Sequence, residues 1–141
     1  MKLNNLIIPG HSIGGICLGT TLGSFLDQLE TNDEIAAEND TIAILNQGLI
    51  TIYYTPQTDL ITAISCNQLF PGIYDNKLWP GMNVADVIRN SFRQTAWSGF
   101  VQIDGIAGIG LSLPQEHDDF ERLNDCLPPD FIFEELWVYN L

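Results

Sequence analysis

Two short stretches of the chain place apolar residues at helical spacing. In both, apolar residues stand three, six and seven positions after a glycine, Gly19 in the first stretch and Gly81 in the second: Leu22, Phe25, Leu26 and Val84, Val87, Ile88. This spacing puts the apolar side chains on one face of a helix. Thr21 and Asn83 hold equivalent positions and are residue types that cap helix N-termini. The pattern predicts two short amphipathic helices.

Stretches rich in Ile, Tyr and Thr follow each predicted helix and are bounded by turn residues, as is typical of strands. The expected strands span residues 41–45, 49–55 and 60–66 in the first half and 99–104, 106–113 and 131–139 in the second. Asp104-Gly105 is a strong hairpin signal. The glycines at 105, 108 and 110 weaken the middle strand of the second set and indicate a close approach of another backbone. We expect an α+β fold with two tandem repeats of a short helix and an antiparallel β-meander.

The length of 141 residues and the 45% hydrophobic content fit one packed domain. We expect repeat one at about 10–67 and repeat two at about 72–141. The last loop differs between the halves, with about four residues (56–59) in the first and residues 114–130 in the second. A short helix is predicted at 118–123 within the longer loop. Long loops in compact domains are often functional, so this loop is a candidate binding surface.

Two segments account for the net charge of −13. Residues 27–40 carry six acids and no base, and residues 116–135 carry eight acids and one base, Arg122; elsewhere four acids balance four bases. Concentrated charge attracts a basic partner and speeds its arrival. The plainer alternative is two solvated acidic loops.

The same acidity argues against nucleic acid and anionic membranes as partners, because both are bound through clustered Lys and Arg. No apolar run has the length of a transmembrane helix, and the N-terminus lacks the apolar region of a signal peptide. We therefore expect a cytoplasmic protein.

Residues 10–14, Gly-His-Ser-Ile-Gly, match the G-x-S-x-G nucleophile elbow of α/β-hydrolases. An elbow needs a strand before the serine and a helix directly after it. Only nine residues precede the motif, and residues 15–19 predict a short strand and a turn. A hydrolase using Ser12, with His117 as its base, is therefore a remote alternative. We interpret the glycines as turn and packing residues and expect no catalytic residue.

No metal or cofactor site is expected from the sequence. The three cysteines, Cys17, Cys66 and Cys126, lack a C-x-x-C spacing, which favours reduced thiols over a zinc site. Glu116, His117, Asp118 and Asp119 lack the alternating oxygen ligands of a calcium loop. No aromatic-rich sugar cleft or phosphate-binding loop is evident either.

The chain contains three tryptophans, Trp79, Trp97 and Trp137, for which core packing is the simplest interpretation. Trp137 alternates with Val138 on the last predicted strand, so one of the two faces outward. An exposed aromatic side chain beside carboxylates is typical of an interface anchor. As the last strand of the chain, this strand is also a candidate for a sheet edge.

Several motifs resemble those of small bacterial immunity proteins. Residues 12–19, Ser-Ile-Gly-Gly-Ile-Cys-Leu-Gly, resemble their "S-I-G-G-I-x-L-G" opening; residues 79–87, Trp-Pro-Gly-Met-Asn-Val-Ala-Asp-Val, resemble their "G-M-T-x-x-E-V" helix start; and residues 129–139 are similar to their final strand. A comparable helix start occurs in tandem β-lactamase-inhibitor-like folds. Here Thr20-Thr21 replaces Met-Thr in the first copy and Asn83 replaces Thr in the second. The resemblance covers about half of the chain.

The resemblance implies a bacterial immunity protein that neutralises a secreted polymorphic toxin, such as those of contact-dependent growth inhibition. The expected partner is the C-terminal domain of a cognate toxin, bound 1:1 by a monomer. A nuclease is favoured because its active cleft is basic, and an acidic surface can occlude it. The expected contacts are the acids of the loop and last strand, with Trp137 as a further anchor: Glu116, Asp118, Asp119, Glu121, Asp125, Asp130, Glu134 and Glu135. An acidic adaptor domain without a toxin partner is the other interpretation.

Overall fold

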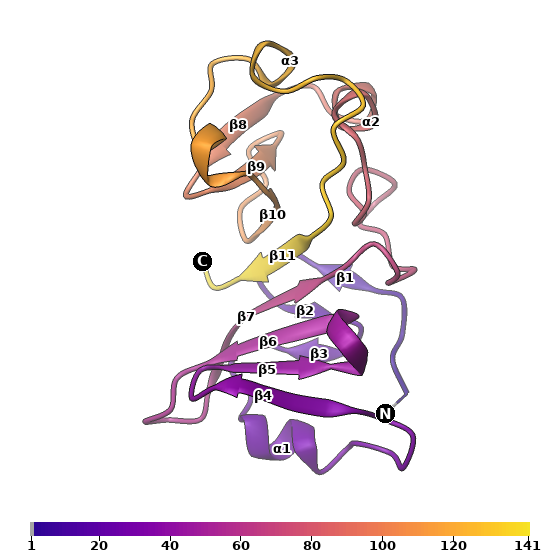
Figure 1. Ribbon diagram of the computed structural model, residues 1–141, viewed down its shortest axis with the longest axis vertical. Coiled ribbons are helices and arrows are strands. Elements are labelled where there is room, and N and C mark those ends of the chain that lie inside the picture. The colour runs from indigo at the N-terminus through magenta and orange to yellow at the C-terminus, as the bar shows by residue number, and fades with distance from the viewer. Residues whose placement is uncertain (1) are drawn as a thin grey trace.

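The computed structural model describes residues 2–141 and has an α+β fold dominated by antiparallel sheets (Figure 1). The larger sheet has eight strands in the order β4-β5-β6-β7-β11-β10-β9-β8, and every neighbouring pair is antiparallel. A three-stranded sheet, β1-β2-β3, packs against β7 on one face. The strands are β1 Ile7–Ile8, β2 Ser12–Ile13, β3 Ile16–Cys17, β4 Ile35–Asn39, β5 Ile42–Leu45, β6 Ile50–Tyr54, β7 Ile61–Cys66, β8 Gln94–Trp97, β9 Phe100–Ile103, β10 Ile109–Ser112 and β11 Leu136–Tyr139.

Both helices predicted from the apolar spacing are present, with the predicted caps. In α1 (Leu22–Leu26) the Thr21 hydroxyl accepts a hydrogen bond from the Ser24 N–H. In α2 (Val84–Arg89) Asn83 and Asp86 form a reciprocal capping box. Such caps pair N–H groups that have no partner inside the helix. None of the helices among residues 2–141 has the length and apolar character that crossing a lipid bilayer would require.

The two outermost strands of the large sheet, β4 and β8, are absent from the sequence prediction, which placed three strands after each helix instead of four. All five residues of β4, Ile-Ala-Ala-Glu-Asn, are exposed, and β8 alternates between partly buried and exposed. Ala, Glu and Asn are depleted in strands, and an edge strand buries little apolar surface. The pairing with β5 and β9 therefore forms these strands without a clear pattern in their own residues.

The end of the chain also differs from the prediction. β11 lies in the middle of the large sheet, between β7 and β10, and not at an edge. The helix expected at residues 118–123 is wrong: a 3-10 turn, η2, spans Gln115–His117 and a short helix, α3, spans Leu123–Cys126. The helix lies where Leu123 and Leu127, one turn apart, are buried in the core, and the acidic residues before it stay in solvent.

One face of the large sheet forms the hydrophobic core together with α1, α2 and the small sheet. Cross-strand neighbours on this face are almost wholly aliphatic, and each is fully buried: Leu45, Ile50, Ile52, Ile64, Val101, Leu111, Leu136 and Val138. Phe25 of α1, and Val84 and Val87 of α2, are buried in the same cluster. The core packs against this face of the sheet, so the opposite face is not part of it.

The glycine-based predictions are confirmed. Asp104 and Gly105 both have left-handed backbone, with φ of 51° and 70°, and Ile106 N donates to Ile103 O at 2.9 Å across the turn. A Cβ at Gly108 would stand 2.6 Å from the Gly10 nitrogen, which itself donates to Gly108 O. A side chain cannot fit there, so the N-terminal segment can approach the backbone before β10.

Candidate protein-binding surface

Four aromatic side chains gather on the face of the large sheet that turns away from the core. Trp137 stacks on Tyr53 with ring centroids 4.6 Å apart, and Phe100 lies 5.6 Å from Trp137 and 5.2 Å from Tyr139. Each is partly buried, whereas their strand neighbours Ile52, Val101 and Val138 are fully buried on the other side. We call Tyr53, Phe100, Trp137 and Tyr139 the aromatic cluster.

Small residues beneath the rings make the aromatic cluster possible. Gly110 pairs with Trp137 across β10 and β11, and a Cβ there would stand 2.7 Å from the Phe100 Cβ. Ser65 pairs with Trp137 on the other side and is buried. Trp137 Nε1 and Tyr139 Oη are both buried and make no hydrogen bond of normal geometry among residues 2–141. Two polar neighbours, the Glu135 carboxylate and the Gly108 backbone, are still close enough to affect the pKa values of Glu135 and Tyr139.

Carboxylates from both acidic segments act on the aromatic cluster. Burial raises the pKa of Tyr53, and the negative charges of Glu135 and Glu38 raise it further, while the Ser65 hydroxyl opposes them. Glu38 is on β4 and belongs to segment 27–40; Glu135 directly precedes β11 and belongs to segment 116–135. Tyr53 therefore experiences the negative charge of one carboxylate from each acidic segment.

Glu135 is itself partly withdrawn from solvent. Burial raises the pKa of this carboxyl, the neighbouring Glu134 raises it further, and the Trp137 indole lowers it. None of the strands β4 to β11 in the described chain contains Lys or Arg. The strands around the aromatic cluster therefore have no positively charged side chain that could neutralise these carboxylates.

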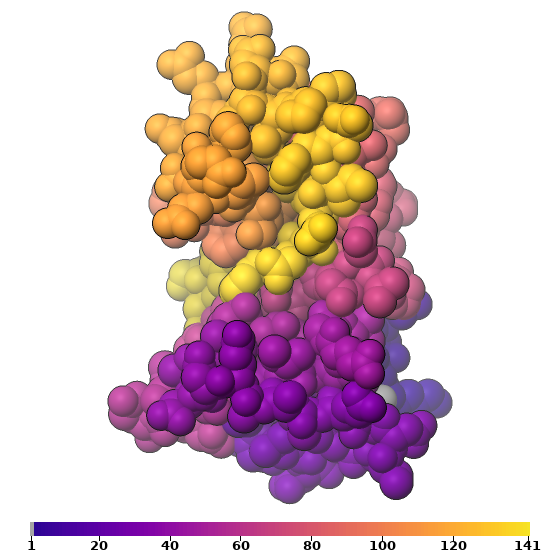
Figure 2. Space-filling model, in the orientation of Figure 1, coloured from indigo at the N-terminus to yellow at the C-terminus, as the bar shows by residue number. Residues whose placement is uncertain are grey.

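The other predicted contact residues lie on the long connection between β10 and β11, residues 113–135, which we call the insertion. It occupies the end of the molecule opposite α1 and β4, so the two acidic segments lie far apart for most of their length (Figures 1 and 2). Seven predicted residues on it are exposed: Glu116, Asp118, Asp119, Glu121, Asp125, Asp130 and Glu134. Of the predicted set, only Glu135 and Trp137 belong to the aromatic cluster and its border.

The insertion is packed onto the fold and does not hang free in solvent. Leu123 and Leu127 are buried, and α3 contacts α2. Cys126 Sγ lies 3.5 Å from His117 Nδ1, a contact that joins α3 to η2. Among the described residues, no three His, Cys, Asp or Glu side chains come together as a metal site would require. The insertion therefore presents its acids from an anchored segment.

Sequence reasoning missed Tyr53, Phe100 and Tyr139, and it assigned Trp97 to the core. Trp97 is 57% exposed and, with Gln102 and Tyr139, lines a hollow of about 310 Å³ beside the aromatic cluster. The signal was present in the sequence, because each missed residue alternates with an aliphatic residue along its strand. The alternation predicted for Trp137 and Val138 is confirmed: Val138 is buried in the core and Trp137 lies on the other face.

Ser12 does not lie on a nucleophile elbow. It belongs to β2, pairs with Ile8 and Cys17, and is buried. The next element is β3, as the sequence indicated for residues 15–19, whereas an elbow continues directly into a helix.

No known protein family, curated protein or solved structure matches this chain.

Proposed function

We propose that this chain is a protein-binding inhibitor, an immunity protein that neutralises a secreted toxin domain by covering its basic cleft. The observation that carries the proposal is the aromatic cluster, which lies on a sheet face without Lys or Arg and is bordered by Glu38 and Glu135. Aromatic anchors with a polar border dominate binding energy in protein interfaces. The carboxylates would steer a basic partner toward them.

The class of toxin follows from the charge. A nuclease must hold phosphates and so has a basic cleft, and the net charge of −13 suits an inhibitor that mimics those phosphates. In this proposal the insertion supplies long-range attraction, through Asp118, Asp119 and their neighbours, and the aromatic cluster supplies the anchor. The inhibitor acts as a monomer in a 1:1 complex in the cytoplasm.

We also propose that the fold is one domain of two tandem repeats, about 10–67 and 72–141. Each helix start is held by the same three backbone hydrogen bonds to the segment that leads into the last strand of its half. In the first half these are Gly19 N to Ile61 O, Ile61 N to Thr20 O and Leu22 N to Asp59 O; in the second they are Gly81 N to Phe133 O, Phe133 N to Met82 O and Val84 N to Phe131 O. This correspondence supports the repeat, with the insertion as an enlargement of the last loop of the second copy.

A growth-rescue assay tests the immunity function. The toxin domain encoded next to this chain is expressed in sensitive cells with and without it. We expect rescue by the wild-type chain and loss of rescue by Trp137→Ala. Absence of rescue by the wild-type chain would overturn immunity and favour an adaptor role.

Association kinetics test the charge-based part of the proposal. The double variant Asp118→Lys/Asp119→Lys is expected to slow association with the toxin domain, and added salt to slow the wild-type chain in the same way. Asp27→Lys/Glu30→Lys, the same charge change beside α1 at the opposite end of the molecule, is the matched control and should slow association less. An association rate that does not change with salt concentration would overturn the proposal that the inhibitor mimics phosphates.

A further inference from the structure

The three cysteines of the chain lie in three different environments. Cys66 on β7 is buried in the core, and burial raises the pKa of its thiol to about 12. Cys17 on β3 and Cys126 at the end of α3 are partly buried, and all three thiols are free. The thiolate is the reactive form of cysteine, and its reagent must be able to reach it. Thiol chemistry is therefore confined to Cys17 and Cys126.

Cys126 differs from Cys17 in its hydrogen-bond partner. Cys126 Sγ lies 3.5 Å from His117 Nδ1, whereas Cys17 Sγ donates to Gly15 O at 3.6 Å. A backbone carbonyl does not take a proton from a thiol at neutral pH, but an imidazole nitrogen does. A thiol within hydrogen-bond reach of an imidazole is the pairing that activates cysteine nucleophiles.

Each of these two thiols also lines a hollow that a small reagent can enter. The hollow at Cys17 has a volume of about 360 Å³, and none of the residues that line it is charged. The hollow at Cys126 has a volume of about 270 Å³ and is lined by four charged side chains: Asp119, Glu121, Arg122 and Asp125. Access to the two thiols is therefore similar, and the sites differ in the imidazole and in the charge.

The charge at Cys126 selects the kind of reagent. Three carboxylates and one guanidinium leave the hollow negative, and Glu116 and Asp118, on either side of His117, add to its field. Anionic reagents such as glutathione disulfide are repelled by this field, whereas an uncharged hydroperoxide is not. The surroundings of Cys126 therefore favour an uncharged oxidant.

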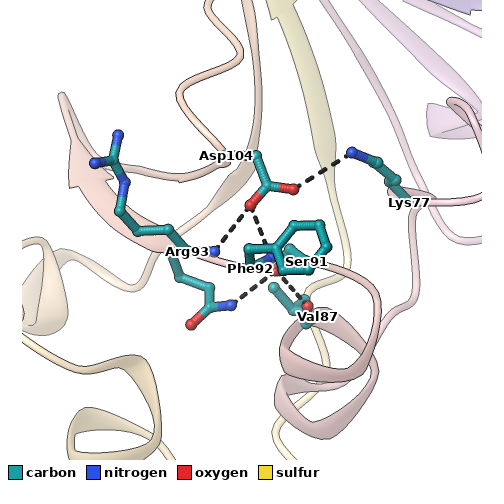
Figure 3. A network of polar contacts seen from close by, with 7 residues as sticks. Lys77, Val87, Ser91, Phe92, Arg93 and Asp104 are labelled. Carbon is teal, nitrogen blue, oxygen red and sulfur yellow. Dashed lines mark hydrogen bonds and ion pairs between the residues drawn. The ribbon is translucent and has the colours of Figure 1, made fainter.

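The helix that carries Cys126 packs on a rigid support. α3 contacts α2, and the chain at the end of α2 is held by its own hydrogen bonds. The Ser91 hydroxyl donates to Val87 O at 2.6 Å, and Asp104 accepts hydrogen bonds from the next two backbone N–H groups, each at 2.8 Å (Figure 3). A fixed support keeps the thiol and its base in reacting geometry, which lowers the entropic part of a barrier.

We infer that Cys126, paired with His117, is a reactive thiol that uncharged hydroperoxides oxidise to a sulfenic acid. The thiol proton moves to His117 Nδ1, and the sulfur attacks one oxygen of hydrogen peroxide. An S–O bond forms as the O–O bond breaks, so the sulfur loses two electrons and the peroxide gains them. The leaving hydroxide takes the proton from His117 and departs as water.

The sulfenic acid has no second cysteine of this chain beside it. Cys17 and Cys66 belong to β3 and β7, which lie away from α3 (Figure 1). An internal disulfide is therefore excluded in the folded chain. A thiol from solution returns the sulfenic acid to cysteine through a mixed disulfide.

Trapping of the sulfenic acid provides the first test. The full chain is treated with hydrogen peroxide and dimedone at neutral pH, and the labelling rate of each cysteine is measured by mass spectrometry. We expect Cys126 to react about tenfold faster than Cys17 and Cys66 to stay unlabelled. Equal rates at Cys126 and Cys17 would overturn the inference. Labelling of Cys66 as fast as Cys126 would show that reaction follows opening of the fold, and would also overturn it. The assay contains no toxin domain, so its result is independent of immunity.

Replacement of the base is the second test. His117→Asn keeps a polar side chain but cannot take the proton, so we expect oxidation of Cys126 to slow about tenfold while Cys17 is unchanged. His11→Asn, the same change at the exposed second histidine, is the matched control and should leave the rate at Cys126 unchanged. An unchanged or faster rate in His117→Asn would overturn the inference.

Two alkylating agents of nearly the same size test the selection for an uncharged reagent. Iodoacetamide is neutral, and iodoacetate carries a negative charge. The rate of iodoacetate relative to iodoacetamide should be about threefold lower at Cys126 than at Cys17 in low salt, and added salt should reduce the difference. Equal relative rates at the two cysteines would overturn the assignment of an uncharged oxidant.

Discussion

The two faces of the large sheet are built from different residues and differ in burial. On the core face, aliphatic neighbours such as Ile64, Leu136 and Val138 are completely buried. On the other face, Tyr53, Phe100 and Trp137 are only partly buried and lie near carboxylates. Neighbouring residues of one strand thus belong to two environments. The difference agrees with our proposal that the core face provides stability and the aromatic face provides recognition.

Leu136→Ala should give the largest loss of stability, because it creates a cavity in the core face. Leu136 is fully buried and pairs with Cys66 and Leu111. We expect the free energy of unfolding to fall by about 2–5 kcal/mol, measured by urea denaturation. The fraction that remains folded should bind the toxin domain with wild-type affinity. Weaker binding by the folded fraction would contradict the separation of the two faces.

Compared with Leu136→Ala, Trp137→Ala should cost less stability and more affinity for the toxin domain. The side chain is partly buried, so we expect a loss of about 2 kcal/mol in the free energy of unfolding, below the range for a fully buried tryptophan. Affinity for the toxin domain should fall about 30-fold or more, as for an interface anchor. Trp137→Phe, which keeps a ring to stack on Tyr53, should restore most of the stability but only part of the affinity. Equal effects on both quantities would show that the cluster is structural.

Gly110→Ala tests whether the aromatic cluster depends on the strand beneath it. The new Cβ would stand 2.7 Å from the Phe100 Cβ, so β9 or the Phe100 ring must shift. We expect a cost of about 1–3 kcal/mol in unfolding free energy, typical of overpacking, and a change in tryptophan fluorescence. Gly99→Ala, where no atom lies within 4 Å but φ is +86°, separates backbone strain from crowding. Unchanged fluorescence in Gly110→Ala would show that Phe100 accommodates the methyl group.

The sequence predicted those parts of the fold that depend on local chemistry. Thr21 and Asn83 cap their helices as expected, and the Asp104-Gly105 turn forms. It did not predict strand β4 or the central place of β11, because both depend on which strand pairs with which. No residue of β4 is buried, so its pairing with β5 leaves no periodic signal in its sequence.

The candidate site was predicted only where charge or alternation was visible. Trp137 and Glu135, two of the predicted contact residues, lie at the aromatic cluster. Tyr53 and Phe100 reach it from other strands, through pairings across β7 and β10 that the sequence does not specify.

Glu135→Gln should have the smallest effect on stability, and its sign distinguishes the two roles of the aromatic face. Burial raises the pKa of Glu135 above its ordinary 4.5, so the folded chain holds this proton more tightly than the unfolded chain. The free energy of unfolding therefore falls as the pH rises from about 4.5 through the raised pKa, and at pH 7 the ionised carboxylate destabilises the fold. Gln removes that charge and keeps the shape.

The variant should therefore be more stable than wild type at pH 7 by up to about 0.5 kcal/mol, and equal to it at pH 4, where Glu135 is protonated. The measurement is thermal unfolding of both proteins at the two pH values, with Glu121→Gln, an exposed carboxylate that does not act on Glu135, as the control. The same variant should bind the toxin domain more weakly, because the partner loses a carboxylate to pair with. A gain in stability coupled to a loss in binding is expected of a residue retained for recognition at the expense of folding. Loss of both quantities would show that Glu135 supports the sheet, and would leave Trp137 as the only predicted contact residue at the aromatic cluster.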